Sequence, residues 1–213
     1  MKKILFCLAI ILSYENCASK TESFNQIIID KEIQERVESE VTDTIEKNQK
    51  ECELNYFNKL HLEFYSNDSL QKDSYTKLIE QFCSYWIEKG DTTNIYGFFG
   101  GENLTHFGFK INIVKRIPKV YFTIRPHMAG FFSYTKDGEK EFNMDIPTKK
   151  SKVILSKMPD NILPNNIYGF VEFETTEFFS IRKYENGEEV PNQRDRVRCN
   201  MKIYFKTNKC DSL

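Results

Sequence analysis

The sequence has little of what marks an enzyme or a metalloprotein. Its three histidines, His61, His106 and His127, are scattered, and no two cysteines have the C-x-x-C spacing of a zinc site. The glycine cluster at residues 97–101 lacks the Lys-Ser/Thr pair of a phosphate loop, so we interpret it as a bend between a helix and a sheet. We therefore predict no metal and no cofactor, and we expect a protein without enzymatic activity.

The sequence also lacks a marked excess of charge of either sign. The formal net charge is -1, because 30 Lys and Arg residues are balanced by 31 Asp and Glu residues. Binding to nucleic acid through counterion release needs a concentrated basic surface, which this balance does not supply. We therefore exclude nucleic acid as a partner. The chain of 213 residues, 40% of them hydrophobic, is long enough and apolar enough for the core of one domain.

The apolar run near the N-terminus is too short to span a bilayer. It covers residues 4–12, whereas a membrane-spanning helix needs about twenty residues. Lys2 and Lys3 precede the run, and a dibasic start followed by a short apolar stretch is typical of a secretion signal. Residues 1–19 are therefore predicted to be a signal peptide, and the protein is expected to be exported.

Two fates of the signal peptide remain open. Cys17 follows the apolar run at the position of a lipid-modified cysteine, although residues 14–16 depart from the usual lipoprotein pattern. Cleavage after Ser19 is the alternative, because Cys17 and Ser19 are small residues at the positions that signal peptidase inspects. We favour lipid attachment at Cys17, which would anchor the protein in the cell envelope. The alternative product is a secreted protein.

Four cysteines remain in the mature chain, an even number that is typical of disulfide-bonded exported proteins. We favour a bond between Cys52 and Cys83 and a second bond between Cys199 and Cys210. Each of these bonds would join segments that lie close together in the sequence.

Residues 20–90 are predicted to form a tether followed by a helical hairpin. Apolar residues recur every four positions over 33–64, although residues 60–64 alternate as a short strand would. A polar, turn-rich break covers 66–74, and residues 75–87 follow the helical period up to Gly90. These patterns predict two antiparallel helices joined at the break.

Residues 91–213 change to a period of two, which predicts an antiparallel sheet. The expected strands include an alternating segment at residues 107–113, another at 120–124, and the segments 142–146, 152–157, 167–175, 178–184 and 196–205. Asp137 and Gly138 form a hairpin signal between two of the segments. The sequence therefore predicts an α+β fold, in which an N-terminal helical hairpin packs on a curved antiparallel β-sheet of about six to eight strands.

A candidate ligand face lies on the polar side of the last predicted strands. Its residues are Arg182, Arg196, Arg198, Lys202 and Tyr204. Charge pairing with Glu172 and Glu174 across neighbouring strands is the simpler interpretation of this basic row. Glu172, Glu174 and Glu177 are also candidates for the carboxylate pair of a glycoside hydrolase.

These observations predict an exported cell-envelope protein that binds or protects rather than catalyses. Its partner would be an unknown protein or small ligand. The alternative is an exported hydrolase whose catalytic residues are too scattered to recognise in one sequence. A deep pocket lined by Glu172, His106 or His127 would favour the hydrolase, whereas a shallow face would favour the binding protein.

Overall fold

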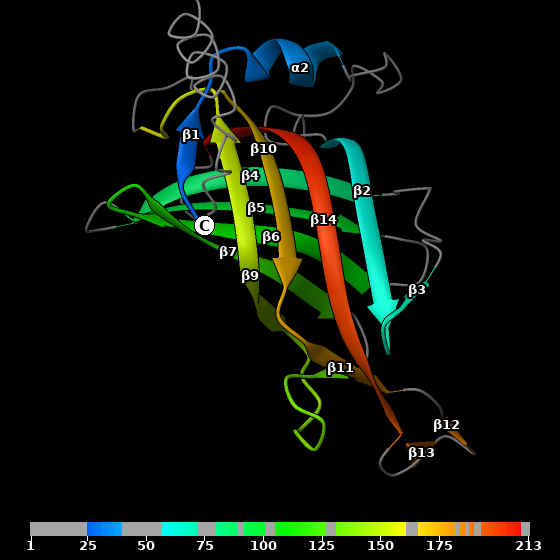
Figure 1. The fold of residues 1–213 in the computed structure, drawn as a ribbon. Coiled ribbons are helices and arrows are strands. Elements are labelled where there is room, and N and C mark those ends of the chain that lie inside the picture. The colour runs from blue at the N-terminus through cyan, green and yellow to red at the C-terminus, as the bar shows by residue number, and fades with distance from the viewer. Residues whose placement is uncertain are drawn as a thin grey trace, which may run out of the picture.

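The computed structural model shows a protein built almost entirely of antiparallel strands in two layers (Figure 1). It describes residues 25–39, 57–71, 80–88, 92–100, 105–126, 131–160, 166–181, 184–185, 188–189 and 193–209. Within these residues, twelve strands form one continuous hydrogen-bonded sheet that folds over on itself. One helix, α2 (Ile33–Ser39), lies on the outside of the front layer.

The two layers are connected by strands that belong to both. The back layer contains β4 (Glu80–Glu88), β5 (Thr92–Gly100), β6 (Thr105–Val114), β7 (Ile117–Pro126) and the first part of β9 (Met144–Leu155). The front layer contains β1 (Ile27–Ile29), β2 (Phe57–Ser66), β3 (Ser69–Gln71), β8 (Phe132–Ser133), the second part of β9, β10 (Ile167–Thr175), β11 (Phe178–Ile181) and β14 (Arg194–Lys209). A separate pair is formed by β12 (Tyr184–Glu185) and β13 (Glu188–Glu189).

β9 and β14 close the two sides of this arrangement. Residues 144–147 of β9 pair with β7, and residues 148–155 pair with β10, with a register shift between Glu174 and Thr175. β14 lies between β10 and β2 for most of its length, and Asn208 and Lys209 then pair in parallel with β4. Figure 1 shows that the strands of the front layer cross those of the back layer. Crossed layers of this kind enclose a single core between their inner faces.

The core is filled by side chains that alternate along each strand. On β14 the inward-facing residues Val197, Cys199, Met201, Ile203 and Phe205 are all buried. Aromatic rings join the layers: the rings of Phe109 in the back layer and Phe205 in the front layer have centroids 5.1 Å apart. A Cβ on Gly169 would lie 2.3 Å from Cζ of Phe205, so only glycine leaves room for this ring.

Two tight hairpins have the backbone geometry of two-residue turns. Asn67 and Asp68 have φ values of 47° and 67° between β2 and β3, and Lys115 and Arg116 have values of 49° and 66° between β6 and β7. Positive φ at both central residues matches the right-handed twist of the flanking strands.

The predicted helical hairpin is wrong. Residues 57–66 form β2 and residues 80–88 form β4, and helical structure in the described part of the chain is limited to α2. In β4, the run from Cys83 to Tyr85 is buried, so the strand has few solvent-facing residues to reveal its period of two. A short apolar run of this kind has the same pattern as a buried helix. Residues 40–56 and 72–79 of the predicted hairpin lie outside the described residues.

The expected number of six to eight strands is also wrong. The sheet has twelve strands, because β1 to β4 come from the residues before 91 and join the strands that follow. The antiparallel strands expected at 107–113, 120–124, 167–175 and 196–205 are present as β6, β7, β10 and β14. The glycine cluster does not form a bend: Gly97 to Gly100 lie within β5, paired with β6 along its whole length. Strand pairing therefore continues through the glycine cluster as far as Gly100.

Candidate functional site

The outer face of the front layer has two halves with different chemistry. In the first half, Ile33 and Val37 of α2 pack on Ile154 of β9 and Tyr168 of β10, so these apolar side chains are buried. The second half has no helix over it among the described residues. We call it the polar face, and it consists of His61, Glu63, Tyr65, Lys150, Lys152, Glu172, Glu174, Arg196, Arg198, Asn200 and Lys202.

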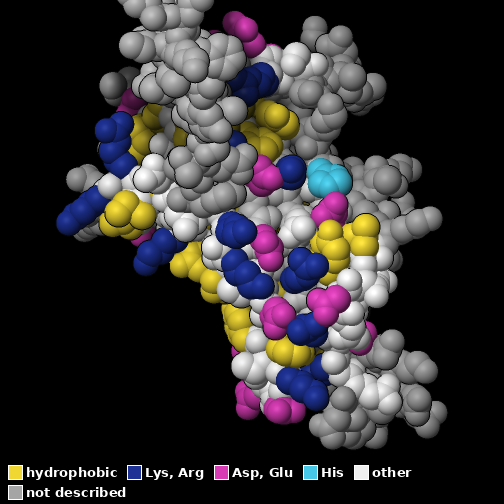
Figure 2. Space-filling model, in the orientation of Figure 1, with side chains coloured by type: hydrophobic (Ala, Val, Ile, Leu, Met, Phe, Trp, Pro, Cys, Tyr) yellow, Lys and Arg dark blue, Asp and Glu magenta, His cyan; other side chains and the backbone are white. Residues whose placement is uncertain are grey.

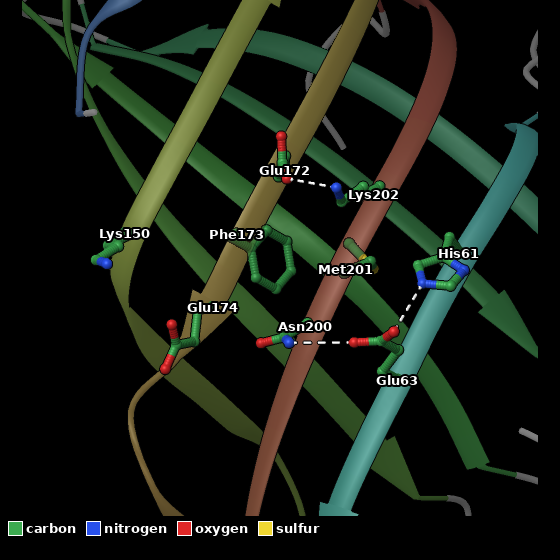
Figure 3. Close-up of a pocket in the computed structure, with 9 residues that line it drawn as sticks. All are labelled: His61, Glu63, Lys150, Glu172, Phe173, Glu174, Asn200, Met201 and Lys202. Atoms are coloured by element: carbon green, nitrogen blue, oxygen red, sulfur yellow. Dashed lines mark hydrogen bonds and ion pairs between the residues drawn. The ribbon is translucent and has the colours of Figure 1, made fainter. Parts of the chain in front are cut away.

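The polar face contains an open hollow of about 320 Å³ across β10, β14 and β2 (Figure 3). It is lined by His61, Glu63, Lys150, Glu172, Phe173, Glu174, Asn200, Met201 and Lys202. Figure 2 shows acidic and basic side chains intermixed over the middle of this side of the molecule. The hollow is therefore a charged surface depression and not a deep apolar pocket of the kind that binds small molecules.

The charges of the polar face alternate in sign from strand to strand. Glu172 lies opposite Lys152 of β9 and Lys202 of β14, and Lys202 Nζ is 2.8 Å from Glu172 Oε1. Glu174 forms two longer ion pairs, one with Lys149 at 3.8 Å and one with Arg198 at 3.9 Å. The simpler interpretation from the sequence, cross-strand charge pairing by these two glutamates, is thus present in the structure.

Glu63 is held as a carboxylate by its neighbours. Tyr65 Oη donates a hydrogen bond to Glu63 Oε2 at 2.9 Å, Asn200 Nδ2 donates at 3.2 Å, and His61 Nε2 lies 3.1 Å from Oε1. The bond from Tyr65 is the main cause of a lowered pKa of Glu63, and it outweighs the opposing effect of partial burial. The same bond raises the pKa of Tyr65. Glu63 therefore suits the binding of cations and N–H donors, not the donation of a proton.

Asn200 presents an unsatisfied acceptor in the same hollow. Its Nδ2 bonds to Glu63, whereas its buried Oδ1 has no hydrogen-bond partner. Figure 3 shows this oxygen directed away from Glu63 and toward the side of Glu174. A buried acceptor without a donor is unfavourable, so an N–H group supplied by a ligand would stabilise it.

The structure brings most of the predicted ligand face together. Arg196, Arg198, Lys202 and Tyr204 all lie on the outer side of β14. Tyr204 belongs to the half next to α2, where its ring is 4.8 Å from that of Phe170. Arg196 lies at the edge of the polar face, paired with Asp68 and, at 3.4 Å, with Glu177. Arg182 lies outside the described residues.

Sequence reasoning missed the contribution of β2. His61, Glu63 and Tyr65 point outward from this strand, while Leu62 and Phe64 pack inward. The alternation of polar and apolar residues at 61–65 was the available signal. The apolar spacing of four residues that runs up to residue 64 predicts the end of a helix there instead.

The other predicted residues give no second site. Cys83 and Cys199 are buried in the core, but their expected partners Cys52 and Cys210 lie outside the described residues, as does Cys17, so these assignments stay predictions. His106 packs its ring against Phe98 on the back layer, with centroids 5.1 Å apart. His127 lies outside the described residues. Among the described residues, no three His, Cys, Asp or Glu side chains are grouped as metal ligands would be.

Glu172 lines an open hollow and not the deep pocket that the hydrolase alternative required, and the geometry also differs from that of a glycosidase. Figure 3 shows the carboxylates of Glu172 and Glu174 directed to different sides of β10. They are also bound to different cations. Glycoside hydrolysis needs two carboxyl groups that face each other across the scissile bond.

Comparison of the chain with family models, with curated proteins and with solved structures returns no match. In the part of the chain that the structure describes, no helix has the length and apolar character needed to cross a bilayer.

Proposed function

We propose that the protein is a non-enzymatic binding protein of the cell envelope, anchored through a lipid on Cys17, and that its polar face binds a peptide segment of a partner protein. The observation that carries this proposal is the alternation of positive and negative side chains across β9, β10, β14 and β2. A segment with charges of both signs would pair its acidic side chains with the basic residues of this face and its basic side chains with the acidic ones, so that no charge is left unpaired.

The size of the polar face supports a peptide segment as the ligand. Four strands about 4.8 Å apart span roughly 14 Å, and the stretch from Arg196 to Lys202 covers roughly 20 Å along β14. An extended segment of about six residues has this length.

Exchanging the charges of one ion pair tests the proposal. In the double variant Glu172→Lys with Lys202→Glu, the two side chains still attract each other, but a ligand meets reversed charges. The exchange Lys136→Glu with Glu139→Lys is the matched control, because both residues are exposed in the loop after β8 and neither lines the hollow. All three chains are used to select binders from a displayed library of hexapeptides, and affinities are measured at low and high salt.

The proposal predicts that peptides selected by the wild-type chain carry both acidic and basic residues. Their affinity falls at least tenfold with the exchanged pair, is unchanged in the control, and falls with added salt. Peptides that bind all three chains equally, or that bind without charged residues, would contradict the proposal. Turnover of a glycan or peptide substrate that depends on Glu172 would instead support the hydrolase.

A further inference from the structure

The tip of the β6–β7 hairpin exposes aliphatic side chains that the rest of the hairpin buries. Val114 is 40% exposed and Ile117 is 62% exposed, whereas Ile111, Ile113 and Val120 on the same strands are buried. The two exposed residues flank the turn residues Lys115 and Arg116. The tip therefore combines two apolar side chains with two adjacent cations.

The hairpin has an excess of positive charge that the described residues around it do not neutralise. β6, β7 and their turn contain Lys110, Lys115, Arg116, Lys119 and Arg125 and no Asp or Glu. Asp145 pairs with Lys110 at 3.3 Å and also with Arg125. The remaining three cations make no ion pair within the described residues.

An acidic residue at the same end of the back layer does not change this balance. Glu88 ends β4, which is separated from β6 by β5. Its carboxylate accepts a hydrogen bond from Trp86 Nε1 at 3.1 Å on its own strand. The surface at Lys115, Arg116 and Lys119 thus remains cationic.

The chain enters the described part of the protein next to this hairpin. Asn25 lines a depression together with Pro118, Lys119 and Tyr121 at the start of β7, and its backbone N–H donates to Ser151 O at 2.8 Å. Figure 1 places β1 and β7 on the same side of the molecule. Asn25 lies eight positions after Cys17 in the sequence. A chain of this length spans at most about 28 Å, so a lipid on Cys17 would keep the membrane surface close to the hairpin.

We propose that the β6–β7 tip docks on the anionic phospholipid surface of the membrane that carries the anchor. Lys115, Arg116 and Lys119 contact lipid phosphates, while Val114 and Ile117 enter the headgroup region. The orientation of the domain rests on the anchor of the proposed function, but the attraction between the tip and the lipid does not. Docking fixes which side of the domain faces the membrane.

The test uses the full chain with Cys17→Ser, which removes the lipid attachment site, and measures binding to vesicles by sedimentation. We expect binding to phosphatidylglycerol vesicles and none to phosphatidylcholine vesicles. Adding Lys115→Ser and Arg116→Ser should weaken binding about 30-fold, since each cation near an anionic surface contributes about a factor of five. Replacing Val114 and Ile117 by Ser should weaken it about tenfold.

The matched control, Lys136→Ser with Lys157→Ser, removes two exposed cations that lie outside the hairpin and outside the polar face, and it should retain binding. Circular dichroism and thermal melting confirm that each variant is folded. Equal binding to both kinds of vesicle, an equal loss in the control, or no binding by the Cys17→Ser chain overturns the docking proposal. Failure of the anchor is detected separately, because it leaves the wild-type chain and the Cys17→Ser chain equally soluble when cells are fractionated.

Discussion

The two halves of the outer front face differ although the same strands run through both. On β10, Tyr168 and Phe170 belong to the half beside α2, and Glu172 and Glu174 belong to the polar face. The first half is stabilised by removal of apolar surface from water. The second is left to solvent, with ion pairs that contribute little to stability. The polar face is therefore expected to contribute less to the stability of the fold than the half beside α2.

Weakening the packing of α2 on the front layer should have the largest effect on the free energy of unfolding. Ile33 is fully buried against the front layer, so Ile33→Ala should lower the free energy of unfolding by about 3 kcal/mol. Urea unfolding followed by circular dichroism measures this loss. Glu35→Ala is the matched control on the exposed side of the same helix, and it should change stability little. Equal losses in the two variants would show that the helix does not pack as described.

A smaller and pH-dependent effect is expected within the polar face. The pKa of Glu63 is lower in the folded state than its ordinary value of 4.5. Its contribution to stability is therefore fully present above pH 4.5 and is lost as the pH falls through the folded-state pKa. Tyr65→Phe should raise the pKa of Glu63 and weaken this acid-dependent loss, as measured by NMR titration and by melting temperature between pH 3 and pH 7.

Glu63→Gln is the control for that titration. It removes the titrating group, so adding Tyr65→Phe to it should leave the remaining pH dependence of melting unchanged. An unchanged pKa of Glu63 in the Tyr65→Phe chain would mean that the hydrogen bond between the two side chains does not form in solution.

The smallest effect is expected for the ion pair itself. Lys202 and Glu172 are 54% and 34% exposed, and pairs in such positions contribute between zero and about 1 kcal/mol. Glu172→Gln should therefore change the unfolding free energy by less than about 0.5 kcal/mol, measured by the same urea titration. A loss as large as that of Ile33→Ala would show that the polar face is structural, and the contrast between the halves would disappear.

The parts of the fold that sequence reasoning predicted are those with one buried and one solvated side. β14 is the clearest example, because its alternation from Val197 to Phe205 matches its burial residue by residue. β4 could not be predicted, since its run of consecutive buried residues hides the period of two that is typical of a strand. For the polar face, the alternation along β14 predicted the row of basic residues. The contact between Glu63 and Asn200 could not be predicted, because it depends on the pairing of β2 with β14. Such pairing between distant segments leaves no local pattern in the sequence.

The position of β14 late in the chain has a consequence for how the protein matures. This strand pairs with β2, β10, β11 and β4, so both layers are incomplete without it. The chain is synthesised from its N-terminus, so the strand that contains Phe57 must wait for the strand that contains Phe205 before the two can pair. Closure of the core is therefore a late, long-range event, and such topologies fold slowly. During that delay the apolar inner faces of the earlier strands are exposed to other chains, so the rate of chain synthesis influences how much protein folds instead of aggregating.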